Sequence, residues 1–93
     1  MEHISVLLNE SIDMLQIKED GIYVDCTLGR GGHRSEILKR LTRGHLYAFD
    51  CDQNEIDESM PRLKKIGDQF TLIHSPFENL KRELAKRGVN FVD

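Results

Sequence analysis

The sequence predicts an α/β fold, the front half of a doubly wound parallel sheet. Three observations support this prediction. Short apolar runs alternate with stretches of helical periodicity along the whole chain, and they do so at regular intervals. A glycine-rich segment joins one of these runs to the helix that follows it. With 93 residues, the chain makes at most one small domain.

Runs rich in β-branched and aromatic residues predict the strands. An extended run at 4–8 is followed by predicted strands at 22–26, 45–50, 70–74 and 89–93. The last run stops at the final residue of the sequence, so the predicted sheet has an open edge that would need to be covered. We therefore expect this chain to be the front half of a larger domain, and a second copy is one reasonable cover for the edge.

Apolar residues at helical spacing predict a helix between each pair of runs. The predicted helices cover 9–15, 33–41, 54–66 and 75–87. Gly44 is expected to end the helix before it in the C′ position, and Gly88 is expected to stop the last helix. Asp52 is expected to cap the 54–66 helix, in which Pro61 predicts a kink or a late start.

The last predicted helix carries its own start signal. Ser-Pro-Phe-Glu at 75–78 reads as an N-cap serine, a proline at the first helical position and a glutamate that closes a capping box. Leu80 and Leu84 continue an apolar face from Phe77. Basic residues on the rest of this helix are most simply a solvated surface.

Composition narrows the class of protein. The net charge of −3 gives no sign of a broad nucleic-acid or membrane surface, and no apolar stretch approaches the length of a membrane span. We therefore expect a cytoplasmic protein with no membrane partner. Cys26 and Cys51 are expected to be small buried thiols, and the four histidines lack metal-ligand spacing, so no metal site is predicted.

The stretch "YVDCTLGRGGHRSEIL" at 23–38 indicates a ligand site. Gly29, Gly31 and Gly32 lie between a strand and a helix, where α/β sheets bind ligands against bare backbone. A phosphate-binding P-loop is excluded because no lysine opens the helix. A dinucleotide fingerprint is disfavoured because Arg34 stands where its third glycine is required.

Two acids favour S-adenosylmethionine as the ligand. Asp25, inside the strand end, suits a ligand that carries a cation, and Asp50, at the end of the next strand, suits ribose hydroxyls. His33 lies next to the glycines at the predicted helix N-terminus, where it could meet a carboxylate. Phe77 could lie against an adenine, although its spacing fits core packing equally well.

The same residues resemble a known family. The segments "HISVLLNE", "DGIYVDCTLGRGGH", "LYAFDCD", "FTLIHSPFENL" and "VNFVD" are similar to the N-terminal portion of the bacterial small-subunit ribosomal RNA cytosine-N4 methyltransferases, the MraW type. The resemblance spans essentially the whole chain. It implies a Rossmann-like class I methyltransferase fold, with residues 1–93 as the N-terminal part of an S-adenosylmethionine-binding domain.

The resemblance also implies roles for individual residues. Gly31, Gly32 and His33 would line the methionine part of the cofactor, Asp50 would hold the ribose and Phe77 would flank the adenine. The cofactor-binding residues expected from pattern and resemblance together are Gly29, Gly31, Gly32, His33, Asp25, Asp50 and Phe77. Arg34 departs from the family pattern, which commonly has serine there.

The implied activity is methylation of the N4 of a cytidine in 16S ribosomal RNA, with the small ribosomal subunit or its RNA as partner. In the family, catalytic and further cofactor-lining residues follow the fourth strand, so this chain alone is expected to be inactive. Two alternatives stay open at this point: a non-catalytic nucleotide-cofactor binding module and a fragment of an NAD-dependent oxidoreductase.

Overall fold

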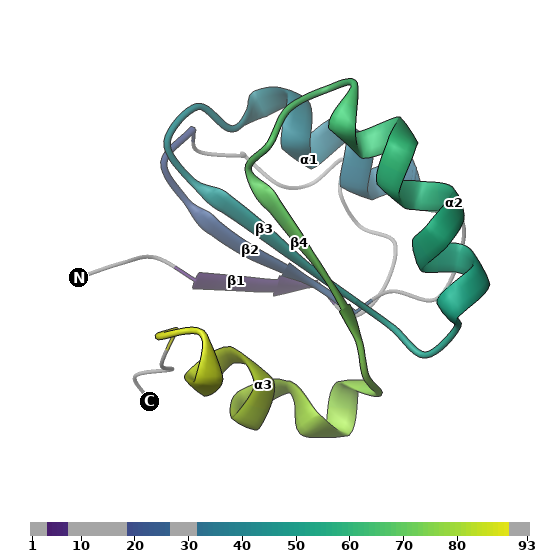
Figure 1. The fold of residues 1–93 in the computed structure, drawn as a ribbon. Coiled ribbons are helices and arrows are strands. Elements are labelled where there is room, and N and C mark those ends of the chain that lie inside the picture. Colours follow the sequence, from purple (N-terminus) through teal and green to yellow (C-terminus); the bar gives the residue numbers. More distant parts are fainter. Residues whose placement is uncertain (1–3, 8–18, 27–31, 90–93) are drawn as a thin grey trace.

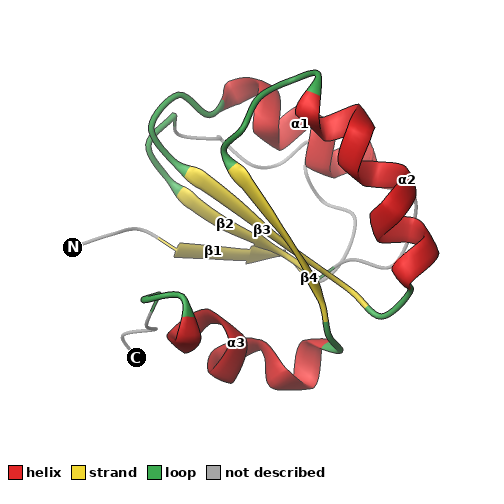
Figure 2. Cartoon of the chain, in the orientation of Figure 1, coloured by secondary structure: helices red, strands yellow, loops and turns green. Residues whose placement is uncertain are grey.

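A computed structural model describes residues 4–7, 19–26 and 32–89 of the chain. Its four strands form one parallel sheet in the order β1-β2-β3-β4 (Figures 1 and 2). The strands are β1 (Ile4–Leu7), β2 (Ile22–Asp25), β3 (His45–Asp50) and β4 (Phe70–His74). The helices are α1 (Gly32–Arg40), α2 (Gln53–Lys64), the 3₁₀ turn η2 (Phe77–Asn79) and α3 (Leu80–Lys86). The predicted α/β class and parallel sheet are confirmed.

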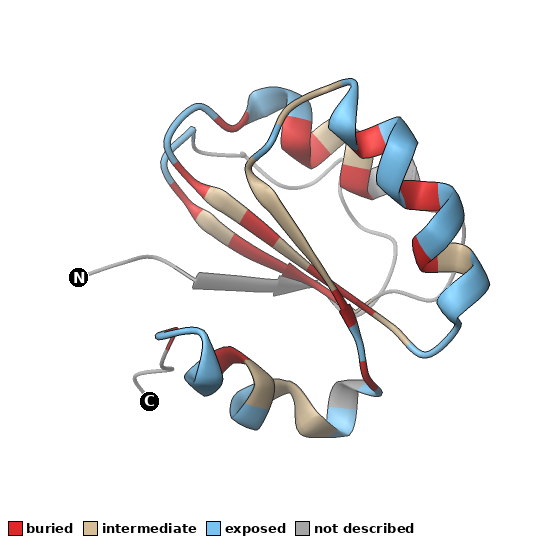
Figure 3. Ribbon diagram, in the orientation of Figure 1, coloured by how far each residue is buried: buried red, intermediate tan, exposed pale blue. Residues whose placement is uncertain are grey.

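The helices lie on both faces of the sheet. α1 and α2 cover one face and α3 covers the other, as a doubly wound fold requires (Figure 1). Each face has its own apolar cluster, and neighbouring buried residues of a strand, such as Tyr23 and Val24, belong to opposite clusters because successive side chains point to opposite faces. Figure 3 shows the buried residues in red on both the strands and the helices. The cluster under α1 and α2 contains Tyr23, Ile37, Leu38, Leu41, Leu46 and Leu63. The cluster under α3 contains Val24, Phe49, Ile73, Leu84 and Val89.

The extended run near the N-terminus is a strand of this sheet. β1 pairs in parallel with β2 in a register that places Ile4 beside Ile22 and Leu7 beside Asp25. β2 therefore lies between β1 and β3, and its carboxyl end is flanked on both sides. The predicted helix at 9–15 and most of the predicted strand at 89–93 lie outside the described residues.

Gly44 does not end α1 in the way the sequence suggested. The helix stops at Arg40, and among the described glycines Gly88 alone has a positive φ, at 81°. Gly44 is needed for a close approach, since a Cβ built on it would lie 2.0 Å from the Gly21 carbonyl oxygen. The prediction that Gly88 stops α3 is confirmed, since the helix ends at Lys86 with Arg87 as its C-cap, whereas the C′ role predicted for Gly44 is wrong because backbone crowding decides that position.

α2 begins early in spite of its proline. Asp52 is the N-cap, as predicted, and its side chain accepts a hydrogen bond from the Asn54 N–H at 2.9 Å. The helix then continues through Pro61, so the expected late start is wrong. An exposed proline near the end of a helix costs a backbone hydrogen bond, but the buried face of Ile56, Ser59 and Leu63 keeps the helix on the sheet.

The capping box predicted for the last helix is wrong. The chain first makes the turn η2, and α3 starts at Leu80 with Asn79 as its N-cap. The Ser75 backbone N–H donates instead to the Asp50 carbonyl oxygen at 3.0 Å, and its hydroxyl accepts from the Asn79 amide at 3.3 Å. Ser75 is thus used to bind the β4 end to the β3 end rather than to start a helix.

Candidate functional site

The two predicted acids come together at the carboxyl edge of the sheet. Asp25 is the last residue of β2 and Asp50 the last residue of β3. Tyr23 and Leu46 pack under α1 and α2. Asp25 follows Tyr23 in β2 at an even spacing, and Asp50 follows Leu46 in β3 at an even spacing. Because side chains alternate between faces, both carboxylates belong to the face that α1 covers.

Arg34, the third residue of α1, bridges these two strand ends. Its Nε donates to Asp25 Oδ2 at 2.7 Å, and one terminal nitrogen donates to the Phe49 carbonyl oxygen at 3.0 Å. The other terminal nitrogen lies 3.6 Å from Asp50 Oδ2. The Arg34 and Asp25 side chains are each 1% exposed, so the guanidinium is a buried cation with acceptors on two strands.

This bridge is the main feature of the site that sequence reasoning missed. In the sequence, Arg34 stands out only as a departure from the glycine of a dinucleotide fingerprint and from the serine common in the family, and neither departure predicts an ion pair. A signal was present, since an arginine in the first turn of a helix lies at the positive end of the helix dipole. The first turn of α1 contains no acid to offset it. A cation in the first turn of the helix that follows a strand ending in an aspartate indicates that the cation pairs with that aspartate.

Asp50 is held in place but stays within reach of solvent. Its Oδ1 accepts a hydrogen bond from the Asp52 backbone N–H at 3.0 Å, while Arg34 lies on the Oδ2 side. Its side chain is 15% exposed. A carboxylate has about four lone-pair positions, so these two partners leave acceptor capacity on the exposed side. That is the arrangement a ligand hydroxyl pair would need.

Asp25 lies behind this outer acid. It is fully buried, and Arg34 takes one of its oxygens. In this geometry the charge of Asp25 is matched by the chain's own cation. Its direct contact with a cofactor therefore stays a prediction.

The remaining predicted residues are only partly described. Gly32 and His33 form the first two positions of α1, beside the β2 end, and Phe77 opens η2 just beyond β4. The backbone of these residues thus lies at the carboxyl edge of the sheet, where Asp50 pairs with His74 in register. Gly29 and Gly31, like the side chains of His33 and Phe77, lie outside the described residues.

The two cysteines differ in their surroundings. Cys26 is half-buried, and burial raises the pKa of its thiol to about 11, with the neighbouring Asp25 charge acting in the same direction. Cys51 is exposed, which corrects the expectation that both thiols are buried.

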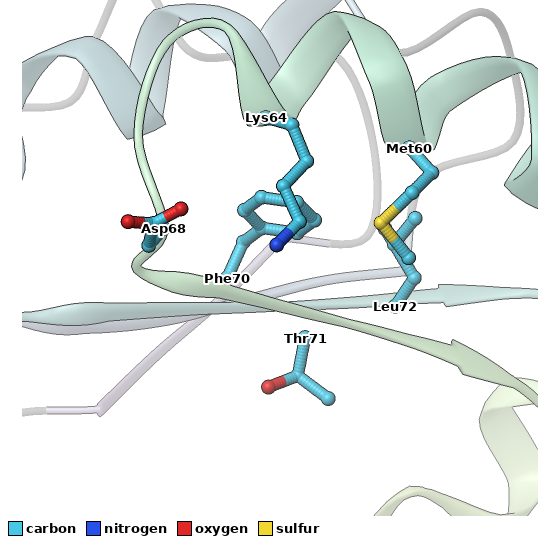
Figure 4. Close-up of a pocket in the computed structure, with 6 residues that line it drawn as sticks. All are labelled: Met60, Lys64, Asp68, Phe70, Thr71 and Leu72. Carbon is cyan, nitrogen blue, oxygen red and sulfur yellow. The ribbon is translucent and has the colours of Figure 1, made fainter.

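A hollow of about 270 Å³ lies elsewhere, between α2 and the beginning of β4 (Figure 4). Met60 and Lys64 extend from α2 toward Phe70 and Leu72 along its wall. These strand residues come at the start of β4, whereas a doubly wound sheet binds ligands at the carboxyl ends of its strands. The hollow is therefore separate from the candidate site.

Within the described ranges 4–7, 19–26 and 32–89, no group of three or more histidine, cysteine or acidic side chains is arranged to hold a metal ion. No helix in those ranges is long and apolar enough to cross a membrane.

Known proteins match the chain along its full length. The protein named ribosomal RNA small subunit methyltransferase H of Mycoplasmopsis agalactiae is 59% identical over 92 residues, which are 99% of this chain and 31% of that protein. The protein of the same name from Exiguobacterium sibiricum is 55% identical, over 99% of this chain and 30% of that protein. Ribosomal RNA small subunit methyltransferase H 1 of Acholeplasma laidlawii is also 55% identical, over 100% of this chain and 31% of that protein. No solved structure matches the chain significantly.

These matches cover the glycine segment, both strand-end acids and the start of α3 together. The chain spans about a third of the length of the curated relatives it matches. The sequence model of one protein family matches the chain over residues 1–93. With that match and relatives more than half identical along 99% of the chain or more, the chain belongs to the MraW methylase family.

Proposed function

We propose that residues 1–93 form the N-terminal part of an S-adenosylmethionine-binding domain, in a protein that methylates the N4 of a cytidine in small-subunit ribosomal RNA. The family match over residues 1–93 carries this proposal, together with relatives whose printed names are those of small-subunit ribosomal RNA methyltransferases. The local geometry agrees with it, because the half-open Asp50 carboxylate is placed where a nucleoside ribose would need acceptors.

We propose a role in cofactor binding for each predicted site residue. Asp50 would accept hydrogen bonds from both ribose hydroxyls, and Gly31, Gly32 and His33, the last two at the N-terminus of α1, would line the methionine part, with Gly29 in the same loop. Phe77 would flank the adenine from the loop after β4. When bound, S-adenosylmethionine supplies an activated methyl group on a sulfonium.

The role of these residues is to bind and orient. Methyl transfer depends mainly on the alignment of the accepting amine with the methyl carbon, so positioning supplies much of the rate. None of the described side chains is placed as a catalytic group, and we propose that residues outside 1–93 complete the site. On this proposal the 93-residue chain by itself is inactive.

The partners follow from the same proposal. On this proposal, ribosomal RNA or the small ribosomal subunit is the macromolecular substrate, and the protein acts in the cytoplasm. Pairing of two copies through an open sheet edge is tested by analytical ultracentrifugation. The relatives' names support the RNA partner alone.

Calorimetric titration tests the cofactor. We expect the protein that carries this chain to bind S-adenosylhomocysteine more tightly than NAD, and Asp50→Ala to weaken that binding at least about tenfold through loss of charge-assisted hydrogen bonds. Asp57→Ala, an exposed acid on α2, is the matched control and should leave affinity unchanged. Tighter binding of NAD would favour the oxidoreductase alternative and contradict the proposal.

The reaction needs its own test. Small-subunit RNA incubated with the protein and S-adenosylmethionine should gain N4-methylcytidine, detected by mass spectrometry of the digested nucleosides. Binding of S-adenosylhomocysteine with no methylated cytidine would support the non-catalytic binding module instead.

A further inference from the structure

We propose that Arg34 is a positioning residue for the ribose of the cofactor, acting through the Asp50 carboxylate. This inference rests on the proposed function, because it concerns the same nucleoside site. It assigns a task to a buried arginine that no cofactor-site pattern in the sequence marked.

The contacts of Arg34 define its geometry. Asp25 anchors Nε at 2.7 Å, and the Phe49 carbonyl oxygen accepts from a terminal nitrogen at 3.0 Å. Both acceptors are buried, and the guanidinium is planar, so these two contacts fix the direction of the remaining nitrogen. That nitrogen lies 3.6 Å from Asp50 Oδ2, on the inner side of the carboxylate.

Arg34 acts on Asp50 without using up its hydrogen-bonding capacity. A separation of 3.6 Å is longer than a hydrogen bond, so the attraction is mainly between charges. Together with the Asp52 N–H at 3.0 Å, it holds the carboxylate from two sides and leaves its exposed side for a ligand. The Arg34 side chain is 1% exposed, so it has no surface with which to contact the ligand itself.

A second consequence concerns the two acids. Asp25 and Asp50 end neighbouring strands on the same face, and without a cation between them their like charges would repel each other. Arg34 lets both stay close at the strand ends, and it also ties α1 to β2 and β3. A purely structural bridge would do this too, so the test must separate fold stability from ribose recognition.

The experiment measures discrimination rather than affinity alone. The probes are S-adenosylhomocysteine and its 2′,3′-dideoxy analogue. The measured quantity is the dissociation constant of the dideoxy analogue divided by that of S-adenosylhomocysteine, which is large when the ribose hydroxyls are recognised. In the variant Arg34→Lys the charge remains, but a lysine lacks the planar fork that serves several acceptors. We expect the ratio to fall about tenfold, the size of one hydrogen bond to a charged group. In the Asp50→Asn background, Arg34→Lys should change the ratio no further.

Two variants guard against misfolding and non-specific effects. Arg40→Lys, on the exposed side of the same helix where Arg40 pairs with Glu36, should leave the ratio unchanged. If Arg34→Lys does not fold, the pair Asp25→Asn with Arg34→Gln removes both buried charges and should lower the ratio in the same way.

The outcomes separate the two proposals. If both ligands weaken equally in Arg34→Lys and the ratio is kept, Arg34 is a structural bridge only and the inference is overturned. If the unmodified protein binds neither ligand, the proposed function itself fails. If the ratio falls and Asp50→Asn abolishes the difference, both stand.

Discussion

Arg34 and Asp25 form an ion pair that is closed off from solvent, with 2.7 Å between Nε and Oδ2 and 1% exposure on each side chain. The pair links the first turn of α1 to the carboxyl end of β2. Burying two charges is costly, so such a pair contributes little net stability compared with an apolar pair, but removing one partner leaves an uncompensated charge.

The first prediction follows from that asymmetry. Arg34→Met should lower the free energy of unfolding by about 3–5 kcal/mol, because Asp25 stays buried without its cation. Adding Asp25→Asn should restore a large part of the loss by removing the stranded charge. Urea unfolding of the single and double variants measures both effects.

The matched control is Lys39→Met on the same helix. Lys39 pairs with Glu36 at 3.3 Å, but its side chain is 57% exposed, so we expect a change within about 0.5 kcal/mol. Equal losses in Arg34→Met and Lys39→Met would contradict the importance given to the buried pair.

The sequence predicts those features that are determined by local residue patterns, but not those that depend on contacts between residues distant in sequence. β3 and β4 were predicted at their observed bounds because local apolar runs determine them. The start of α3 was not, because Ser75 bonds to Asp50, a residue distant in sequence. A capping signal is local, and a contact between strand ends overrides it.

The candidate site shows the same limit. Asp25 and Asp50 could be placed at one sheet edge from strand order alone. Their different depths could not, because they depend on where the Arg34 side chain lies. The role of Gly44 was predicted wrongly as a helix end, because the constraint on it, the nearby Gly21 carbonyl, is a tertiary contact.

A second prediction tests that contact. Gly44→Ala should destabilise the protein by about 1–3 kcal/mol, since its Cβ would lie 2.0 Å from the Gly21 carbonyl oxygen and the backbone must move. Gly67→Ala is the control, because a Cβ there has no atom within 4 Å and its φ is not positive. Thermal unfolding should show Gly67→Ala unchanged or slightly stabilised; a loss as large as that of Gly44→Ala would refute the crowding argument.

A third prediction concerns thiol reactivity. With a pKa of about 11, Cys26 carries roughly one thiolate in a thousand at pH 8, and it is half-buried as well. Iodoacetamide should therefore modify the exposed Cys51 well before Cys26 in the folded protein, as read by mass spectrometry of peptides over time. The difference should vanish in urea, where burial no longer applies. Equal rates in the folded state would show that Cys26 is not shielded.

The last prediction concerns pH and His45. Burial lowers the pKa of this imidazole, and its Nε2 lies 2.8 Å from Thr71 Oγ1. The unfolded chain then takes up a proton near the ordinary value of about 6.5, while the folded protein stays neutral to lower pH. The contribution of His45 to stability is therefore present above about pH 6.5 and is lost as the pH falls from there through the lower folded pKa.

His45→Gln should remove that contribution to the pH dependence. Urea midpoints measured at steps between pH 7.5 and pH 5 should fall less steeply for this variant than for the unmodified protein. Thr71→Val is the control: it deletes the hydrogen bond at 2.8 Å but keeps His45 half-buried, so the slope should remain. If Thr71→Val flattens the profile as much as His45→Gln does, the hydrogen bond rather than burial would be the cause of the shift.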